Sequence, residues 1–128
     1  MATVPAQQEH LGLSVRFDEI VVDCSDPAKL ARFWAAALGY EIVDDEPDLA
    51  SIEDPVADGP AMTFQRVAET KNGKNRVHFD LTVTDEVFER AKRTLEQLGA
   101  HEVDVGQGPD RSWAVMADPE GNEFCLVT

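Results

Sequence analysis

Short runs of β-branched and aromatic residues, alternating with polar ones, recur along the chain, and each run predicts a β-strand. The run at residues 16–24 is rich in Ile and Val, and the run at residues 77–83 repeats its alternation. Clusters of Asp, Asn, Pro and Gly separate the shorter runs, as expected for turns. Those shorter strands are predicted at residues 40–43, 49–52, 61–67, 101–103, 113–116 and 123–127.

Two segments instead carry apolar residues at helical spacing. The first begins at residues 25–27, where a capping residue precedes a proline, and it ends at Gly39. The second begins at Asp85, which we expect to be its cap, and ends at Gly99. The apolar faces comprise Leu30, Phe33, Trp34, Ala37 and Leu38 in the first helix and Val87, Phe88, Ala91, Leu95 and Leu98 in the second.

The two helical segments occupy equivalent places in an internal repeat. Asp26 and Asp85 are 59 positions apart, and Gly39 and Gly99 are 60 positions apart. The order of one strand, one helix and three strands therefore occurs twice, which predicts an α+β fold with two βαβββ modules around a shared cleft rather than a ferredoxin-like fold. We expect a tail at residues 1–14 and one domain at 15–128, with module one at about 15–68, a linker at 69–75 and module two at about 76–128.

The charge balance narrows the classes of partner. The 128 residues carry a formal net charge of −14, which repels phosphate backbones and anionic membrane surfaces, so neither nucleic acid nor membrane is an expected partner. The two cysteines are too few for a disulfide scaffold. The sequence shows neither a signal peptide nor a long apolar run, so a cytoplasmic location is expected.

Three segments together carry a family resemblance: residues 23–39, Arg-Val-His-Phe-Asp-Leu at 76–81, and Asp-Pro-Glu-Gly-Asn-Glu-Phe at 118–124. They resemble the vicinal oxygen chelate superfamily of glyoxalases, bleomycin resistance proteins and extradiol dioxygenases, and in particular its glyoxalase-like subgroup. The resemblance covers nearly the whole chain after residue 15. It implies two modules that form an open barrel around a ligand cleft, and members often pair as homodimers.

The resemblance also implies a divalent metal between the modules, with ligands from the first and fourth strand of each. Its usual spacings select Glu19, His78 and Cys125, and the repeat offset adds Gln65. Zinc, nickel or iron would suit such a site. Glu19 and His78 are then also the candidate catalytic residues. Cys125 replaces the Glu of catalytic members and is either a ligand or a packed thiol.

Strand alternation independently places these four positions on the face away from the helices. The same alternation directs Val77, Phe79, Leu81 and Val83 toward the core.

Further residues are candidates for contact with a substrate. Asp23 and Asp80 share the open face with Glu19, and clustered carboxylates would favour a cationic ligand. Arg111 and Trp113 follow a glycine-rich loop that could cover the cleft. Arg111 would bind an anionic group or remain a surface charge, and Trp113 would stack on a ligand.

Three functions remain open, because this fold carries many reactions. The first is a metal-free protein that binds an antibiotic or metabolite. The second is a metal-dependent lyase or isomerase of the glyoxalase I type. The third is an accessory domain without chemistry.

Overall fold

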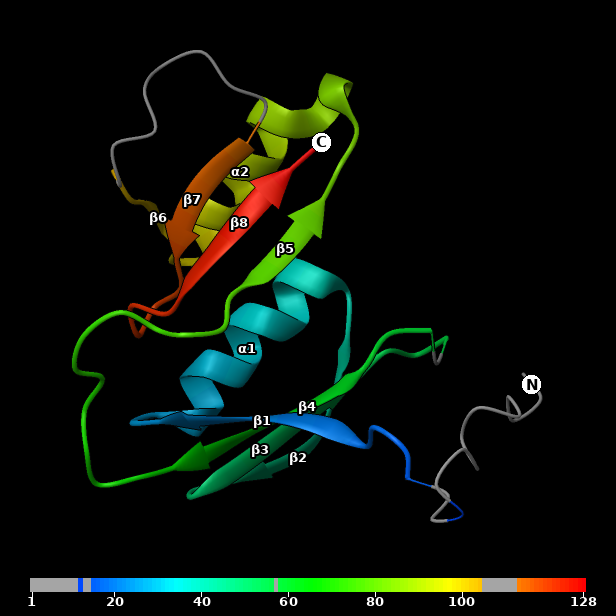
Figure 1. The fold of residues 1–128 in the computed structure, drawn as a ribbon, viewed down its shortest axis with the longest axis vertical. Coiled ribbons are helices and arrows are strands. Elements are labelled where there is room, and N and C mark those ends of the chain that lie inside the picture. Colours follow the sequence, from blue (N-terminus) through cyan, green and yellow to red (C-terminus); the bar gives the residue numbers. More distant parts are fainter. Residues whose placement is uncertain (1–11, 13–14, 57, 105–112) are drawn as a thin grey trace.

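Two four-stranded sheets build the protein, one in each half of the chain (Figure 1). The structure, a computed structural model, describes residues 12, 15–56, 58–104 and 113–128. The first half contains β1 (Glu19–Cys24), α1 (Pro27–Leu38), β2 (Glu41–Glu46), β3 (Leu49–Glu53) and β4 (Ala61–Arg66). The second contains β5 (Phe79–Thr82), the 3-10 turn η2 (Asp85–Val87), α2 (Phe88–Leu98), β6 (His101–Glu102), β7 (Trp113–Ala117) and β8 (Glu123–Val127).

The strand order is the same in both sheets, which confirms the predicted α+β fold of two βαβββ modules. The first sheet has the order β1-β4-β3-β2 and the second has the order β5-β8-β7-β6. In each sheet the first strand of the module pairs parallel with the last, and the other neighbours are antiparallel. β1 and β5 are therefore both edge strands.

The helix ends are set by local chemistry. The Asp26 side chain accepts a hydrogen bond from the Lys29 N–H at 3.2 Å, and Gly39 ends α1 with a φ of 72° that favours glycine. The prediction that Asp85 caps the second helix was wrong. Asp85 instead begins η2, and α2 starts only at Phe88, because a tighter turn precedes the regular helix.

α1 lies between the two sheets, and α2 covers the second sheet (Figure 1). α1 contacts β2, β3 and β4, while its Phe33 and Trp34 rings reach Phe124 of β8 in the other module. Consecutive residues of α1 are therefore buried, as expected for a helix with partners on more than one side. Neither helix in the described part of the chain is long and apolar enough to span a bilayer.

The segment at residues 77–83 alternates as predicted with one exception. Phe79, Leu81 and Val83 pack against the core. Val77 does not face the core as expected, since 75% of its surface is exposed. The ladder of β5 begins only at Phe79, so Val77 belongs to the segment that enters the strand and lies at the molecular surface.

Candidate functional site

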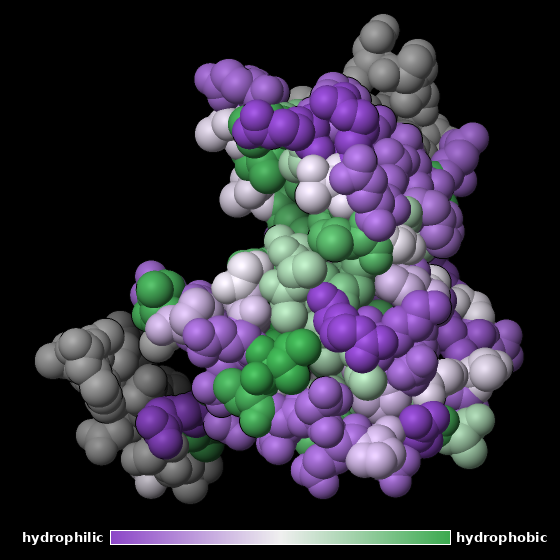
Figure 2. All heavy atoms as spheres, turned by 180° about the vertical axis from the view of Figure 1, so that it is seen from behind, coloured by the Kyte–Doolittle hydropathy of each residue, from purple (hydrophilic) through white to green (hydrophobic). Residues whose placement is uncertain are grey.

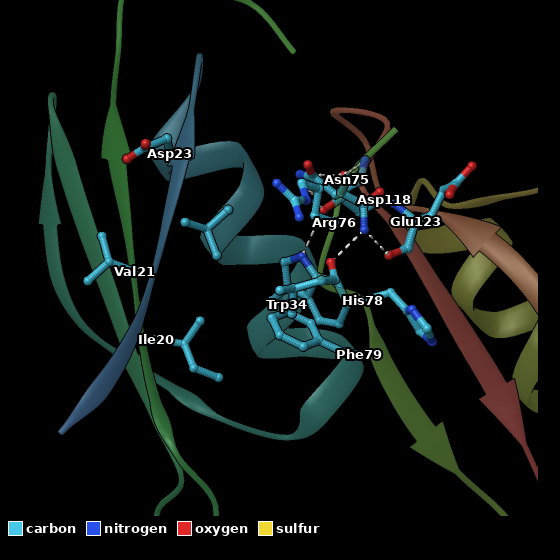
Figure 3. Close-up of a pocket in the computed structure, with 13 residues that line it drawn as sticks. Ile20, Val21, Asp23, Trp34, Asn75, Arg76, His78, Phe79, Asp118 and Glu123 are labelled. Atoms are coloured by element: carbon cyan, nitrogen blue, oxygen red, sulfur yellow. Dashed lines mark hydrogen bonds between the residues drawn. The ribbon is translucent and has the colours of Figure 1, made fainter. Parts of the chain in front are cut away.

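A pocket of about 460 Å³ lies between the modules, and we call it the inter-module pocket (Figure 3). Ile20 and Val22 of β1 and Trp34 of α1 line it from the first module, while Arg76, Val77 and Phe79 line it from the second. It therefore follows the gap between the two edge strands. Figure 2 shows from behind that the surface is hollowed at the waist between the two lobes, where apolar residues gather.

Apolar side chains form a large part of the wall of the inter-module pocket. Ile20 points toward Trp34, whereas Val21 and Asp23 point away from it (Figure 3). The Trp34 ring meets the Phe79 ring edge to face, with centroids 5.7 Å apart, and Trp34 is only 2% exposed. Such edge-to-face pairs hold rings in a fixed geometry. The walls thus form a preshaped surface suited to the apolar part of an organic molecule.

A buried carboxylate holds Trp34 in place. Asp118 is 1% exposed, and its Oδ2 atom accepts a hydrogen bond from Trp34 Nε1 at 3.0 Å. Its Oδ1 atom accepts from the backbone N–H groups of Glu120 and Asn122 at 2.9 and 3.0 Å, and the Asn122 amide donates to both oxygens. Because its acceptors are saturated, Asp118 acts as a structural group rather than a free base.

Glu120 fixes the same turn to the helix of the first module. Its two carboxylate oxygens accept hydrogen bonds from the Ser25 and Asp26 N–H groups at 2.8 and 2.7 Å. These are backbone donors at the start of α1, where a negative charge is also favoured by the helix dipole. Asp118 and Glu120 therefore connect the last turn of module two to α1.

The segment entering β5 is held by Asn75. The Asn75 amide donates to the Val77 carbonyl at 2.6 Å and to the Glu123 carbonyl at 3.3 Å, and its oxygen accepts from the Glu123 N–H at 3.0 Å. The next side chain, Arg76, extends from this segment toward β1 (Figure 3). Asn75 thus sets the position of the backbone that carries Arg76.

Two of the four predicted metal positions lie in the first sheet. Glu19 accepts a short hydrogen bond from the Thr63 hydroxyl, and Thr63 also contacts the Ser51 hydroxyl at 2.8 Å. Gln65 pairs with Asp23 at the far end of β1. Glu19 and Gln65 are therefore at opposite ends of the same strand pair.

The pairing registers explain why Gln65 does not match Cys125. Cys125 pairs with Asp80, and the repeat offset of 59 relates Asp80 to Val21. Val21 pairs with Thr63, so Thr63 is the counterpart of Cys125 in the first module. The two modules differ by a few residues in their connections, which is why one offset does not hold along the whole repeat.

The other two predicted metal positions come together in the second sheet, joined by Asp80. Ligand atoms of His78, Asp80 and Cys125 all lie within 4.8 Å of one another, and within the described ranges this is the one such group of three. His78 Nε2 is 3.2 Å from Asp80 Oδ1. Burial, and then the negative charge of Asp80, raises the pKa of the Cys125 thiol above its ordinary value. Glu19 is not a member of this group.

The group contains the kinds of donor that zinc prefers. Ligand atoms around a tetrahedral zinc are about 3.5 Å from one another. Side-chain rotations that move the ligand atoms by about an ångström would bring these three to that separation. One imidazole, one carboxylate and one thiol leave a fourth position open. The donor chemistry therefore fits a divalent ion, with Asp80 in place of Glu19 and Gln65.

The remaining predicted contact residues are dispersed. Asp23 is the residue before the last of β1, and its carboxylate is directed away from Trp34 (Figure 3). Trp113 begins β7 opposite Val127. Arg111 lies outside the described residues. Sequence analysis did not select Asn75, Arg76, Asp118 or Glu120 as site residues. A signal for them was present, since each lies in or beside a segment that carries the family resemblance.

The sequence model of the glyoxalase-like domain matches residues 19–127. The chain belongs to the glyoxalase-like domain family. This assignment confirms the resemblance to the vicinal oxygen chelate superfamily. No curated protein matches the sequence of this glyoxalase-like protein.

Solved structures share the fold at low sequence identity. A glyoxalase/bleomycin resistance protein/dioxygenase family enzyme from Burkholderia phytofirmans has a TM-score of 0.67 at 16% identity, covering 85% of this chain and 94% of its own. A hypothetical protein from S. aureus has a TM-score of 0.69 at 20% identity, covering 94% and 99%. A mutant of the fosfomycin resistance protein FosX from Listeria monocytogenes, complexed with Mn(II) and 1S,2S-dihydroxypropylphosphonic acid, has a TM-score of 0.65 at 15% identity, covering 88% of each chain.

Proposed function

We propose that this glyoxalase-like protein binds a small organic molecule in the inter-module pocket. The observation that carries the proposal is the apolar surface of Ile20, Val22, Trp34 and Phe79 in a pocket that also has polar lining residues. Its volume lies within the range of about 300 to 1,000 Å³ that is typical of ligand sites. FosX, which shares the fold, is complexed with a small phosphonate, and this agrees with a ligand cleft in such proteins.

Recognition is favoured over acid–base chemistry because the acidic groups that line the pocket are either engaged or, like Asp23, directed away from Trp34 (Figure 3). Asp118 is saturated by hydrogen bonds, and Glu123 pairs with Lys74. His78 turns away from Trp34 (Figure 3) and contacts Asp80. A general base needs a free acceptor within hydrogen-bond reach of a substrate proton. The apolar walls therefore supply binding surface rather than a catalytic group.

The test is a thermal-shift screen of small metabolites and antibiotics on the full chain, followed by titration calorimetry of each stabilising compound. Val77→Trp places an indole at the rim of the pocket and should weaken binding at least about tenfold, because the ring occupies ligand volume. Val56→Trp is the matched control, since Val56 is 71% exposed and is not among the lining residues.

The control should bind like the wild type. If stabilising compounds bind Val77→Trp as tightly as they bind Val56→Trp, or if no compound stabilises the protein, the proposed function is wrong.

A divalent metal site at His78, Asp80 and Cys125 is the second candidate function, and it would serve a lyase or isomerase. The grouping of their three ligand atoms favours it. A metal held there would polarise a substrate oxygen. FosX is complexed with Mn(II), but a thiol donor suits zinc better than manganese. Because the raised pKa keeps Cys125 protonated at neutral pH, zinc binding should release a proton.

The metal site is tested by titrating zinc into protein purified without a metal-binding tag. Zinc should raise the melting temperature of the wild type and slow the alkylation of Cys125. His78→Ala, Asp80→Asn and Cys125→Ser should each lose the stabilisation. His101→Ala is the control, because His101 is exposed on β6 and lies outside the group. Equal zinc stabilisation of wild type and Cys125→Ser would rule out this site.

A further inference from the structure

We propose that Arg76 anchors an acidic group of the ligand, so that the inter-module pocket selects an apolar molecule carrying a carboxylate or phosphate. This inference rests on the proposed function and specifies the class of ligand. An acidic ligand differs from the cationic ligand that the clustered carboxylates predict. Two of those carboxylates have partners, because Glu19 accepts a hydrogen bond from Thr63 and Asp80 contacts His78.

The charged residues around the pocket differ in how they are paired. Among the residues that the structure describes, Arg76 makes no hydrogen bond or ion pair. Arg76 is also the one lysine or arginine among the described residues that line the pocket. Three carboxylates share the pocket lining with it. Asp118 is saturated by Trp34 and its own turn, Glu123 is paired with Lys74, and Asp23 points away from Trp34 (Figure 3). Arg76 is thus a cation that, among the described residues, pairs with none of the carboxylates lining the pocket.

Hydrogen bonds hold the backbone beside Arg76 in position. Asn75 uses both its amide nitrogen and its amide oxygen to fasten the backbone beside Arg76 to β8. A held backbone reduces the freedom that Arg76 loses when it binds a ligand. The guanidinium offers paired donors that match the two oxygens of a carboxylate or phosphate.

The guanidinium of Arg76 lies close to apolar side chains of the pocket. It extends toward β1 at the end of a pocket whose walls are Ile20, Val22, Trp34 and Phe79 (Figure 3). A ligand that fills the apolar part displaces water from around Arg76, which strengthens the attraction between opposite charges. The overall charge of −14 disfavours anions elsewhere on the surface, so specificity for an acidic ligand must come from a local cation.

The test uses probes with one apolar body and different end groups: 4-phenylbutyrate, 4-phenylbutyl phosphate, 4-phenylbutanol and 4-phenylbutylamine. Titration calorimetry on the wild type should show that at least one acid binds at least about fivefold tighter than the alcohol, as a charge-assisted hydrogen-bonded pair predicts. The amine should bind no tighter than the alcohol. The two acids distinguish a carboxylate site from a phosphate site.

Arg76→Met keeps much of the side-chain volume and should remove the preference for the acids while the alcohol binds as before. Arg76→Lys should retain part of the preference, because it keeps the charge and loses the paired donors. Arg90→Met is the matched control on the exposed face of α2, and it should behave like the wild type.

The inference is overturned if acids and alcohol bind the wild type equally, if no probe binds, or if Arg76→Met keeps the preference. Binding to Val77→Trp shows whether only this inference fails or the proposed function fails as well. Ligands that are lost in Val77→Trp but show no dependence on Arg76 leave the pocket as a binding site and remove only its selectivity for acids.

Discussion

At the scale of single residues, the sequence predicts which side chains are buried better than it predicts their partners. Helical spacing correctly placed Phe33 and Trp34 in the core, where they are 3% and 2% exposed. It could not identify the hydrogen bond from Trp34 to Asp118, because 84 positions separate the two residues and only the fold brings them together. The same limit explains why Asn75 was not recognised as the residue that holds the segment before Arg76.

Cys24 gives a prediction of pH dependence at this scale. Burial raises the pKa of its thiol from the ordinary value of 9.0 to about 11. Between these values the unfolded chain ionises Cys24 while the folded protein keeps it neutral, so the free energy of unfolding should fall as the pH rises through this window. The loss should approach about 1.4 kcal/mol per pH unit from this group.

Urea denaturation at pH 8 to 11, a range that includes the window between the ordinary pKa and the raised one, compares the wild type with Cys24→Ala. The variant lacks the thiol, so the difference in stability between the two proteins should shrink as the pH rises. A constant difference across the window would show that the thiol of Cys24 titrates normally in the folded state.

At the scale of elements, strand and helix order followed from periodicity, whereas register and helix starts depended on contacts outside each segment. The alternation of β1 and β8 correctly separated inward from outward residues. The repeat offset selected Gln65 because it ignored the length of the connections, and the observed register gives Thr63 instead. The apolar spacing of the second helix begins at Val87, but Val87 belongs to η2 and α2 begins one residue later, at Phe88.

The start of α1 supplies the prediction at this scale. Glu120→Gln removes the charge from the carboxylate that accepts the Ser25 and Asp26 N–H groups. The free energy of unfolding should fall by about 1 kcal/mol, because a charged acceptor is lost at a helix N-terminus. Glu46→Gln on the exposed strand β2 is the control and should change stability by less than about 0.5 kcal/mol.

Both variants are compared by urea denaturation at neutral pH. Equal stabilities of Glu120→Gln and Glu46→Gln would mean that Glu120 does not stabilise the contact between the last turn and α1.

At the scale of the whole molecule, the repeated order of elements was sufficient to predict two modules and a site between them. The exact place of that site was not predictable from strand faces. The inter-module pocket follows the edges of β1 and β5 and takes Ile20 and Val22 from the face that was assigned to the helices. The candidate metal group lies within the second sheet, where Asp80 joins two of the predicted ligands. Predicted properties of the assembly, such as a homodimer, stay predictions.

The most direct test of ligand binding in the inter-module pocket is an NMR titration that follows the indole N–H signal of Trp34. The protein has two tryptophans, and Trp34→Phe assigns the two signals. Because Trp34 lines the pocket, a stabilising ligand should shift its signal saturably, with the dissociation constant found by calorimetry. The shift should be lost in Val77→Trp. A ligand that binds with the same constant and leaves the Trp34 signal unmoved would contradict the account.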